Sequence, residues 1–209
     1  MKEGIELSKM SLYGNRQRNR IFQAMMRHKF LTVCAISLVT YLLLNPRPYS
    51  LSYSGIIHDV DPYLVWEFLA DFNNMMKLNP TIESFSIMYD KGETRNYWEY
   101  GVYYTEHLSN LPFVKNAAHA VYKIYKLEDP SLEFTIESHH RTCFIGEYFC
   151  VDSESKFVCK PHGLQSKDTY CLEEVTYECP RLGYLFCHSE VTYQRRTIFK
   201  NLIQEFKST

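Results

Sequence analysis

The chain has 209 residues, of which 45% are hydrophobic and 22% are charged, and its formal net charge is −1. This balance is typical of a folded globular protein and excludes an extended disordered chain. A near-neutral chain also lacks the overall positive field of a nucleic-acid-binding protein, so no nucleic-acid partner is expected. The length suffices for one domain of about 150 residues together with additional segments.

An uncharged, apolar run, Phe30–Leu44, lies near the N-terminus. As a helix it spans about 22 Å, so Lys29 and Asn45 must extend its reach across a hydrocarbon core about 30 Å thick. Basic residues are concentrated before the run, which by the positive-inside rule leaves the N-terminus in the cytosol. We therefore predict a basic tail over residues 1–29 and a transmembrane signal anchor over residues 30–45. The predicted localisation is a single-pass endomembrane protein with its domain on the luminal or extracellular side.

Three alternatives for this run stay open. A cleaved signal peptide would have an unusually long basic region and no clear small-residue cleavage site. A mitochondrial presequence agrees with the acid-free stretch Arg16–Lys29 but not with Glu3 and Glu6. A buried helix of a soluble domain would be expected to contain more polar residues.

The next segment begins the expected domain. Two prolines in residues 46–51 indicate a short stiff linker, so the domain is predicted over residues 52–209. Ser52–Val60 is predicted as a strand. Asp61 and Pro62 are typical of a helix start, and apolar residues at helical spacing predict a helix over Tyr63–Lys77 that ends near Asn79–Pro80.

From residue 81 the hydrophobic period changes to two, which is typical of strands with one buried face. The predicted strands are Thr81–Tyr89, Tyr97–His107, His119–Leu127, a strand through Leu132, Phe134 and Ile136, then Tyr148–Val151, Phe157–Lys160 and Thr169–Cys179. From about Leu182 the spacing becomes helical again, with apolar positions at Tyr184, Val191, Ile198, Leu202 and Phe206.

Three stretches resemble the START-like (SRPBCC) superfamily, which includes polyketide cyclases and coenzyme Q-binding proteins. They are Asp61–Phe85 as the opening helix, Asp168–Pro180 as the last strand and Val191–Lys207 as the closing helix. The resemblance implies an α+β helix-grip fold, in which a curved antiparallel sheet of about six to seven strands wraps around a long C-terminal helix. Here a transmembrane helix would precede this fold. The resemblance also implies an apolar cavity of a few hundred Å³ between sheet and helix.

Inward-facing side chains are the candidates for the wall of that cavity. They are Trp98, Tyr100, Tyr104, Phe134, Ile136 and Tyr148 from the strands, and Val191 and Ile198 from the closing helix. Each of them could equally be an ordinary core residue. Arg195 lies among apolar residues of the helix, where it could bind the polar head of a ligand or extend to solvent. His140 could hydrogen-bond a ligand, act in acid–base chemistry or end a strand.

No nucleophile–base motif, phosphate-binding glycine loop or familiar metal-ligand spacing occurs, so no catalytic residue, cofactor or metal is predicted. The spacing of His139, His140 and Cys143 does not favour a metal site. The leading hypothesis is a membrane-anchored domain that binds, and in one version transfers, a hydrophobic ligand such as a lipid or isoprenoid. One alternative is a cyclase, dehydratase or hydrolase with His140 paired to Glu106 or Glu99. The other is an interaction domain with a filled core. The oligomeric state is not predicted.

Six of the seven cysteines fall within residues 143–187, which indicates either disulfides in an oxidising compartment or buried thiols in a reducing one. A tight hairpin at Glu154–Ser155 would place Cys150 opposite Cys159, whereas a loop centred on Gln165 would place Cys171 opposite Cys159. We favour the Cys150–Cys159 pairing. Cys179 and Cys187 flank the Pro180–Gly183 turn and could form a second bridge.

Overall fold

The computed structural model describes residues 25–94, 97–125, 133–144, 146–163 and 167–207. The chain consists of two compact units, residues 1–45 and residues 46–209. In the first unit a helix runs over Met25–Leu44 with its side chains exposed, and by length and composition it could cross a membrane. With 20 residues this helix spans about 30 Å, which matches the thickness of a hydrocarbon core. It therefore depends less on flanking side chains to reach the membrane surfaces than the apolar run alone does. Most of the predicted basic tail, residues 1–24, lies outside the described residues.

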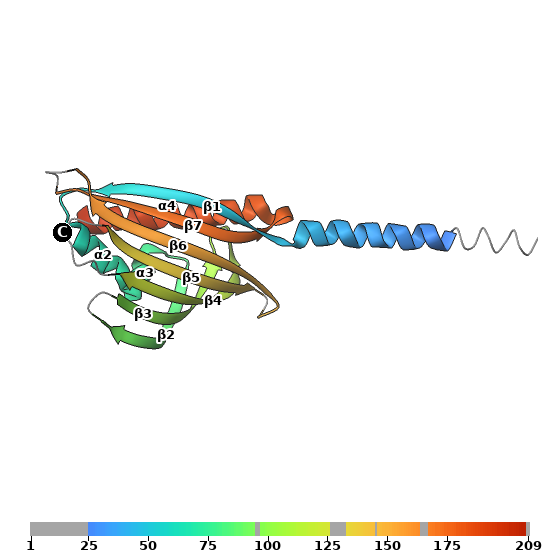
Figure 1. The fold of residues 1–209 in the computed structure, drawn as a ribbon, viewed down its shortest axis with the longest axis horizontal. Coiled ribbons are helices and arrows are strands. Elements are labelled where there is room, and N and C mark those ends of the chain that lie inside the picture. Colours follow the sequence, from blue (N-terminus) through green and yellow to red (C-terminus); the bar gives the residue numbers. More distant parts are fainter. Residues whose placement is uncertain (1–24, 95–96, 126–132, 145, 164–166, 208–209) are drawn as a thin grey trace, which may run out of the picture. The chain divides into compact units, whose positions relative to one another are not determined.

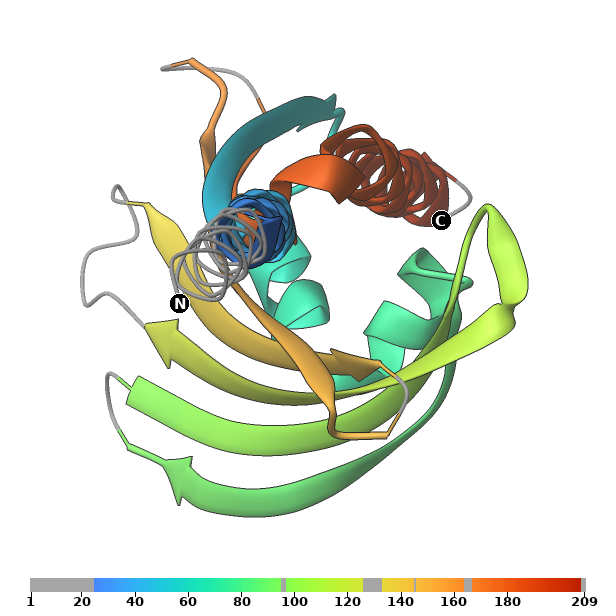
Figure 2. The ribbon, with the colours of Figure 1, turned by 90° about the vertical axis from the view of Figure 1, so that its right-hand side faces the viewer.

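The second unit is built on a seven-stranded antiparallel sheet with the order β1-β7-β6-β5-β4-β3-β2 (Figure 1). Its strands are β1 (Pro46–Ile57), β2 (Ile82–Glu93), β3 (Tyr97–Leu108), β4 (Leu111–Tyr125), β5 (Phe134–Phe144), β6 (Phe149–Pro161) and β7 (Thr169–Pro180). The helices are α2 (Pro62–Ala70), α3 (Phe72–Leu78), the 3-10 turn η1 (Arg181–Gly183) and α4 (Tyr184–Lys207). The strongly curved sheet holds all the helices of this unit on its concave side (Figure 2). The predicted helix-grip architecture is confirmed.

The predicted linker over residues 46–51 is wrong, because these residues form the first half of β1. They pair with β7 in an unbroken register from Pro46 opposite Pro180 to Ile57 opposite Thr169. Prolines are tolerated here because β1 is an edge strand, where half of the backbone N–H groups have no neighbour to bond. Pro112, at the start of β4, likewise does not break the sheet.

Two other predicted boundaries also differ. The predicted helix over Tyr63–Lys77 is two helices, because Asp71 lies between them in extended geometry and its side chain accepts a hydrogen bond from the Asn73 backbone N–H at 2.9 Å. The two predicted strands Tyr148–Val151 and Phe157–Lys160 lie, except for Tyr148, in the single strand β6. The polar residues between them keep the alternation of the strand, so no turn forms at Glu154–Ser155.

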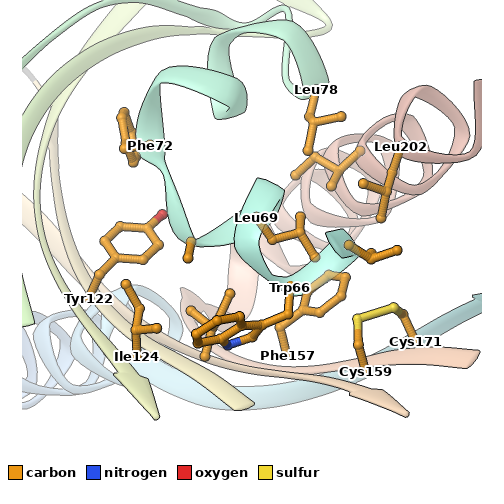
Figure 3. Packing of buried hydrophobic residues seen from close by; sticks show 14 of the residues in the cluster. Trp66, Leu69, Phe72, Leu78, Tyr122, Ile124, Phe157, Cys159, Cys171 and Leu202 are labelled. Carbon is orange, nitrogen blue, oxygen red and sulfur yellow. A yellow bond between two sulfur atoms is a disulfide. The ribbon is translucent and has the colours of Figure 1, made fainter. Parts of the chain in front are cut away.

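The main core fills only part of the concave face. Trp66 and Leu69 of α2 and Phe72 of α3 lie over Tyr122, Ile124 and Phe157 of the sheet, and Leu78 of α3 lies near Leu202 of α4 (Figure 3). The Cys159–Cys171 disulfide closes this core where β6 meets β7. Because α2 and α3 are short, the sheet extends beyond them on one side.

Candidate functional site

A cavity of about 340 Å³ lies on the concave side of the sheet beyond α2 and α3. None of its described lining residues comes from these two helices. The walls are instead formed by one end of strands β3 to β7, by η1 and by the first half of α4. The volume falls within the range of ordinary small-molecule sites. Most wall residues are apolar, among them Leu108, Phe144, Phe149, Val151, Val175, Phe186 and Val191.

The deep end of the cavity is polar. Five residues line both this cavity and a smaller hollow of about 50 Å³ that lies between the cavity and the core. We call them the polar partition, and they are Tyr104, Glu106, His140, Gln194 and Arg195. Their positions follow from the strand alternation, because Tyr104 and Glu106 continue the inward-facing series of β3 and His140 continues that of β5.

Arg195 forms a buried ion pair at the partition. Its Nη1 lies 2.7 Å from Oε1 of Glu173 on β7, and the same oxygen accepts a hydrogen bond from the Ser155 hydroxyl at 2.7 Å. Arg195 Nε and Glu173 Oε2 are buried and have no partner among the described residues. The partition therefore offers a buried donor and a buried acceptor in addition to the ion pair.

Glu106 is the second ionisable group of the partition and is only 7% exposed. Burial raises the pKa of its carboxyl group to about 7, an effect that the nearby Arg195 guanidinium opposes and the Glu190 carboxylate reinforces. Asn116 donates a hydrogen bond to Glu106, whereas its own Oδ1 is buried without a partner among the described residues. Glu106 thus titrates near neutral pH inside a largely apolar space.

His140 is held on both sides of its ring. Nδ1 lies 3.0 Å from the Tyr104 hydroxyl and Nε2 lies 2.9 Å from the Ser138 hydroxyl. Burial, together with the positive charge of Arg195, lowers the pKa of His140 to about 3. At neutral pH the imidazole is therefore uncharged, and both of its nitrogens are engaged in hydrogen bonds.

Several solved structures have a fold similar to that of this domain. The domain is similar to the ZhuI aromatase/cyclase from Streptomyces sp. R1128, with a TM-score of 0.55 at 13% identity over 77% of this chain and 94% of that one. It is also similar to a START superfamily protein from Mycobacterium smegmatis, with a TM-score of 0.52 at 10% identity over 76% of this chain and 97% of that one. The chain has a START-like fold. By sequence it matches no known family profile and no curated protein.

The START-like domain brings together six of the ten residues predicted to bind ligand. Tyr104, His140, Val191 and Arg195 line the cavity, and Ile136 and Ile198 line the small hollow together with three of these. Arg195 does not extend to solvent, because its side chain is only 19% exposed and is paired with Glu173. Ligand binding by these residues stays a prediction.

The other four predicted wall residues lie elsewhere. Trp98, Tyr100 and Phe134 do not border the cavity. The helix α2 covers two of them, because the Tyr100 hydroxyl donates to the Ala70 carbonyl at 2.7 Å and Phe134 packs on Trp66. Trp98 packs on Tyr100 and donates a hydrogen bond to Asp90. Tyr148 is 95% exposed in the turn that precedes β6. The predicted volume of a few hundred Å³ agrees with the cavity, whereas these four residues do not border it.

Buried polar residues were missed by the sequence analysis. Glu173, Glu190 and Asn116 were not proposed, although Asn116 and Glu173 lie at buried positions of alternating strands and Glu190 at a buried position of α4. Glu190 accepts three hydrogen bonds from Ser109, one of them from the hydroxyl at 2.6 Å. Glu99, in contrast, is bound by Lys91, Tyr89 and Tyr97 and lines neither cavity, so it does not pair with His140. Within the described ranges no cluster of His, Cys, Asp or Glu could hold a metal ion.

Proposed function

We propose that the START-like domain binds an elongated apolar molecule, such as a lipid or isoprenoid, whose polar end carries an uncharged hydroxyl or carbonyl group. The observation that supports this most directly is the form of the cavity, which has apolar walls and a polar partition at its deep end. Apolar walls favour an apolar body, and a few buried polar groups fix its orientation.

The charges at the partition support an uncharged polar end. Glu106, Glu173 and Glu190 bring three carboxyl groups together against one guanidinium, Arg195, which is already paired. An anionic head group would therefore be repelled when all three are ionised. A hydroxyl group could accept a hydrogen bond from Arg195 Nε and donate one to Asn116 Oδ1, which are two of the buried atoms without a partner among the described residues.

We also propose that the helix over Met25–Leu44 anchors the domain in a membrane, with the domain on the luminal or extracellular side. The length and composition of this helix and the basic residues before it support the anchor and its orientation. Three disulfides, Cys143–Cys150, Cys159–Cys171 and Cys179–Cys187, support an oxidising compartment.

Ligand retention by a cavity-filling variant tests the binding function. Val191 lines the cavity, so Val191→Trp should fill part of it; Tyr193→Trp is the matched control, because Tyr193 lies on the same helix, is exposed and lines neither cavity. We expect mass spectrometry of the full chain, purified in mild detergent, to find one apolar compound with wild type and with Tyr193→Trp. Val191→Trp should lose it. Equal recovery from all three proteins would contradict binding in this cavity.

One observation favours an enzyme as the second candidate. A carboxyl group with a pKa of about 7 inside a ligand cavity is suited to general acid–base catalysis, whereas His140, which is neutral, is not a proton donor at that pH. Incubation of the recovered compound with wild type and with Glu106→Gln distinguishes the two functions. Conversion by wild type alone would establish catalysis, and an unchanged compound in both would support binding.

A further inference from the structure

Six large side chains are exposed in three segments of the START-like domain. Leu182 in η1 is 71% exposed, and Leu185 in the first turn of α4 is 80% exposed. Phe186 also lies in α4, Phe113 lies in the β3–β4 hairpin, and Tyr148 and Phe149 lie where the β5–β6 turn leads into β6. We call this set the apolar rim, and it consists of Phe113, Tyr148, Phe149, Leu182, Leu185 and Phe186. Exposed apolar groups gathered in this way mark surfaces that contact a membrane or another protein.

The strand register places the three segments at the same end of the sheet. Leu108 pairs with Leu111 at the tip of the β3–β4 hairpin, and Phe144 pairs with Phe149 at the β5–β6 turn. The end of β7 leads directly through η1 into α4. Figure 2 looks onto this end of the domain, where these segments surround the concave side.

The same end is the mouth of the cavity. Phe149 and Phe186 line the cavity and are partly exposed, whereas Glu106 and His140 of the polar partition, which also line it, are buried. Exposure thus increases from the polar partition toward the apolar rim. A ligand whose polar end reaches the partition would have its apolar end near Phe149 and Phe186.

The chain enters the domain at this end as well. Pro46, the first residue of β1, pairs with Pro180, the last residue of β7, and Leu182 follows two residues later. The N-terminal helix ends at Leu44, and two residues of extended chain span at most about 7 Å. If the N-terminal helix crosses a membrane, Pro46 and its partner Pro180 therefore lie at the surface of that membrane.

We propose that the apolar rim inserts into the surface of the bilayer that holds the N-terminal helix, so that the cavity opens toward the lipid phase. This inference rests on the proposed anchor and the proposed apolar ligand, and it adds the route of entry. The ligand passes between bilayer and cavity without exposing its apolar body to water. Leucine and phenylalanine side chains gain free energy in the acyl region, and the exposed Arg47 and Arg181 lie beside the rim, where they meet lipid phosphates. The charge of the exposed Glu147, next to Tyr148, stays in the head-group region and limits the rim to the boundary between head groups and acyl chains.

Depth-dependent quenching tests the insertion. The full chain with Cys34→Ala is reconstituted in dioleoylphosphatidylcholine vesicles, with an environment-sensitive fluorophore on Leu185→Cys. The matched control carries it on Leu64→Cys, because Leu64 is 50% exposed in α2, which begins at the opposite end of the sheet. Phosphatidylcholine brominated on its acyl chains should quench the label at position 185 and leave the label at position 64 unchanged. Equal, weak quenching at both positions would overturn the proposal.

A second variant tests the apolar rim as a unit. Leu182→Asp combined with Leu185→Asp should reduce, several-fold, the quenching of a label on Tyr148→Cys, with an unchanged circular dichroism spectrum. Quenching that persists after both substitutions would contradict joint insertion.

A label at position 185 that responds to protein density but not to brominated lipid would show a second copy of the chain on the rim, which also overturns the proposal. A recovered ligand without quenching would refute this inference alone, whereas quenching without any recovered ligand would refute the proposed function alone.

Discussion

Arg195 on α4 and Glu173 on β7 form a buried ion pair, with 2.7 Å between Nη1 and Oε1. The pair links the closing helix to the sheet at the point where the core ends and the cavity begins. Burying two charges away from water costs a large desolvation free energy, which is offset only by their mutual attraction and their hydrogen bonds. We therefore expect the ion pair to fix the position of α4 more than it adds to the stability of the domain.

Removing one partner of this ion pair should be costly. Arg195→Met leaves the Glu173 carboxylate buried without its cation, so we expect the free energy of unfolding in urea to fall by about 3 to 5 kcal/mol. The double variant Arg195→Met with Glu173→Leu removes both charges and should recover a large part of that loss. A double variant whose loss equals the sum of the losses of the two single variants would show that the two side chains are not coupled, which would contradict the ion pair.

Glu106 should make the stability of the domain depend on pH. Its pKa in the folded domain, about 7, is above the ordinary value of 4.5, so the folded domain binds this proton more tightly than the unfolded chain does. The resulting contribution is fully present below about pH 4.5 and is lost as the pH rises through 7, which corresponds to about 3 kcal/mol. Glu106→Gln cannot ionise and should abolish that decrease. Urea unfolding of both proteins between pH 4.5 and pH 8.5 measures the difference.

His140 titrates in the opposite sense and serves as the internal comparison for that experiment. Its depressed pKa, about 3, means that the unfolded chain binds the proton more tightly, so this contribution is lost as the pH falls below 6.5. The His140 contribution is the same in wild type and Glu106→Gln, so it cancels in the difference between the two proteins. That difference should change most between pH 4.5 and pH 7, where Glu106 is ionised in the unfolded chain but protonated in the folded domain. A pH dependence of equal size in wild type and Glu106→Gln over that window would contradict the assignment.

The architecture was predictable because it follows from local periodicity. Leu132, Phe134 and Ile136 alternate with polar residues, and the closing helix carries Val191, Ile198 and Leu202 on one side. Capping residues such as Asp61 mark helix starts through a short-range hydrogen bond, here to the Tyr63 backbone N–H at 2.8 Å. These signals depend only on residues close together in the sequence, so they can be recognised without knowledge of the tertiary structure.

The position of the cavity was not predictable in the same way. Alternation shows that Tyr100 and Tyr104 face the same side of β3, but it does not show that α2 covers the first and leaves the second beside the cavity. That depends on where α2 ends, and hence on the break at Asp71. The partners of Cys159 were ambiguous for a related reason. Choosing between Cys150 and Cys171 required knowing that residues 149–161 form one continuous strand.

The membrane topology can be tested with an engineered glycosylation site. Gly92 has a φ of 77°, which asparagine tolerates better than most residues, and a Cβ at this position has nothing within 4 Å. Gly92→Asn creates an Asn-x-Thr acceptor with Thr94. If the domain is luminal, we expect this variant to gain one glycan in a eukaryotic host and to resist extraction by alkaline carbonate. Addition of Thr94→Ala removes the acceptor and is the control. Absence of a glycan together with extraction into the soluble fraction would contradict the proposed anchor.

The number of free thiols tests the disulfides and the compartment together. Cys159 and Cys171 are direct partners in the β6–β7 register, as are Cys143 and Cys150 in β5–β6, and both pairs are bonded. The bridge favoured from sequence, Cys150–Cys159, is wrong, because nine residues along one extended strand separate the two by about 30 Å. The predicted Cys179–Cys187 bridge is present.

We therefore expect denatured, unreduced protein from its native membrane to have one accessible thiol, Cys34, and reduction to expose all seven cysteines. Peptide mapping without reduction should recover Cys159 joined to Cys171. The paired substitution of both residues by serine should lower the free energy of unfolding by about 2 to 4 kcal/mol, since it removes the constraint on the unfolded chain. Cys34→Ser is the control and should leave the unfolding of the domain unchanged. Seven accessible thiols before reduction would refute the bridges and would remove the main compositional support for a luminal domain.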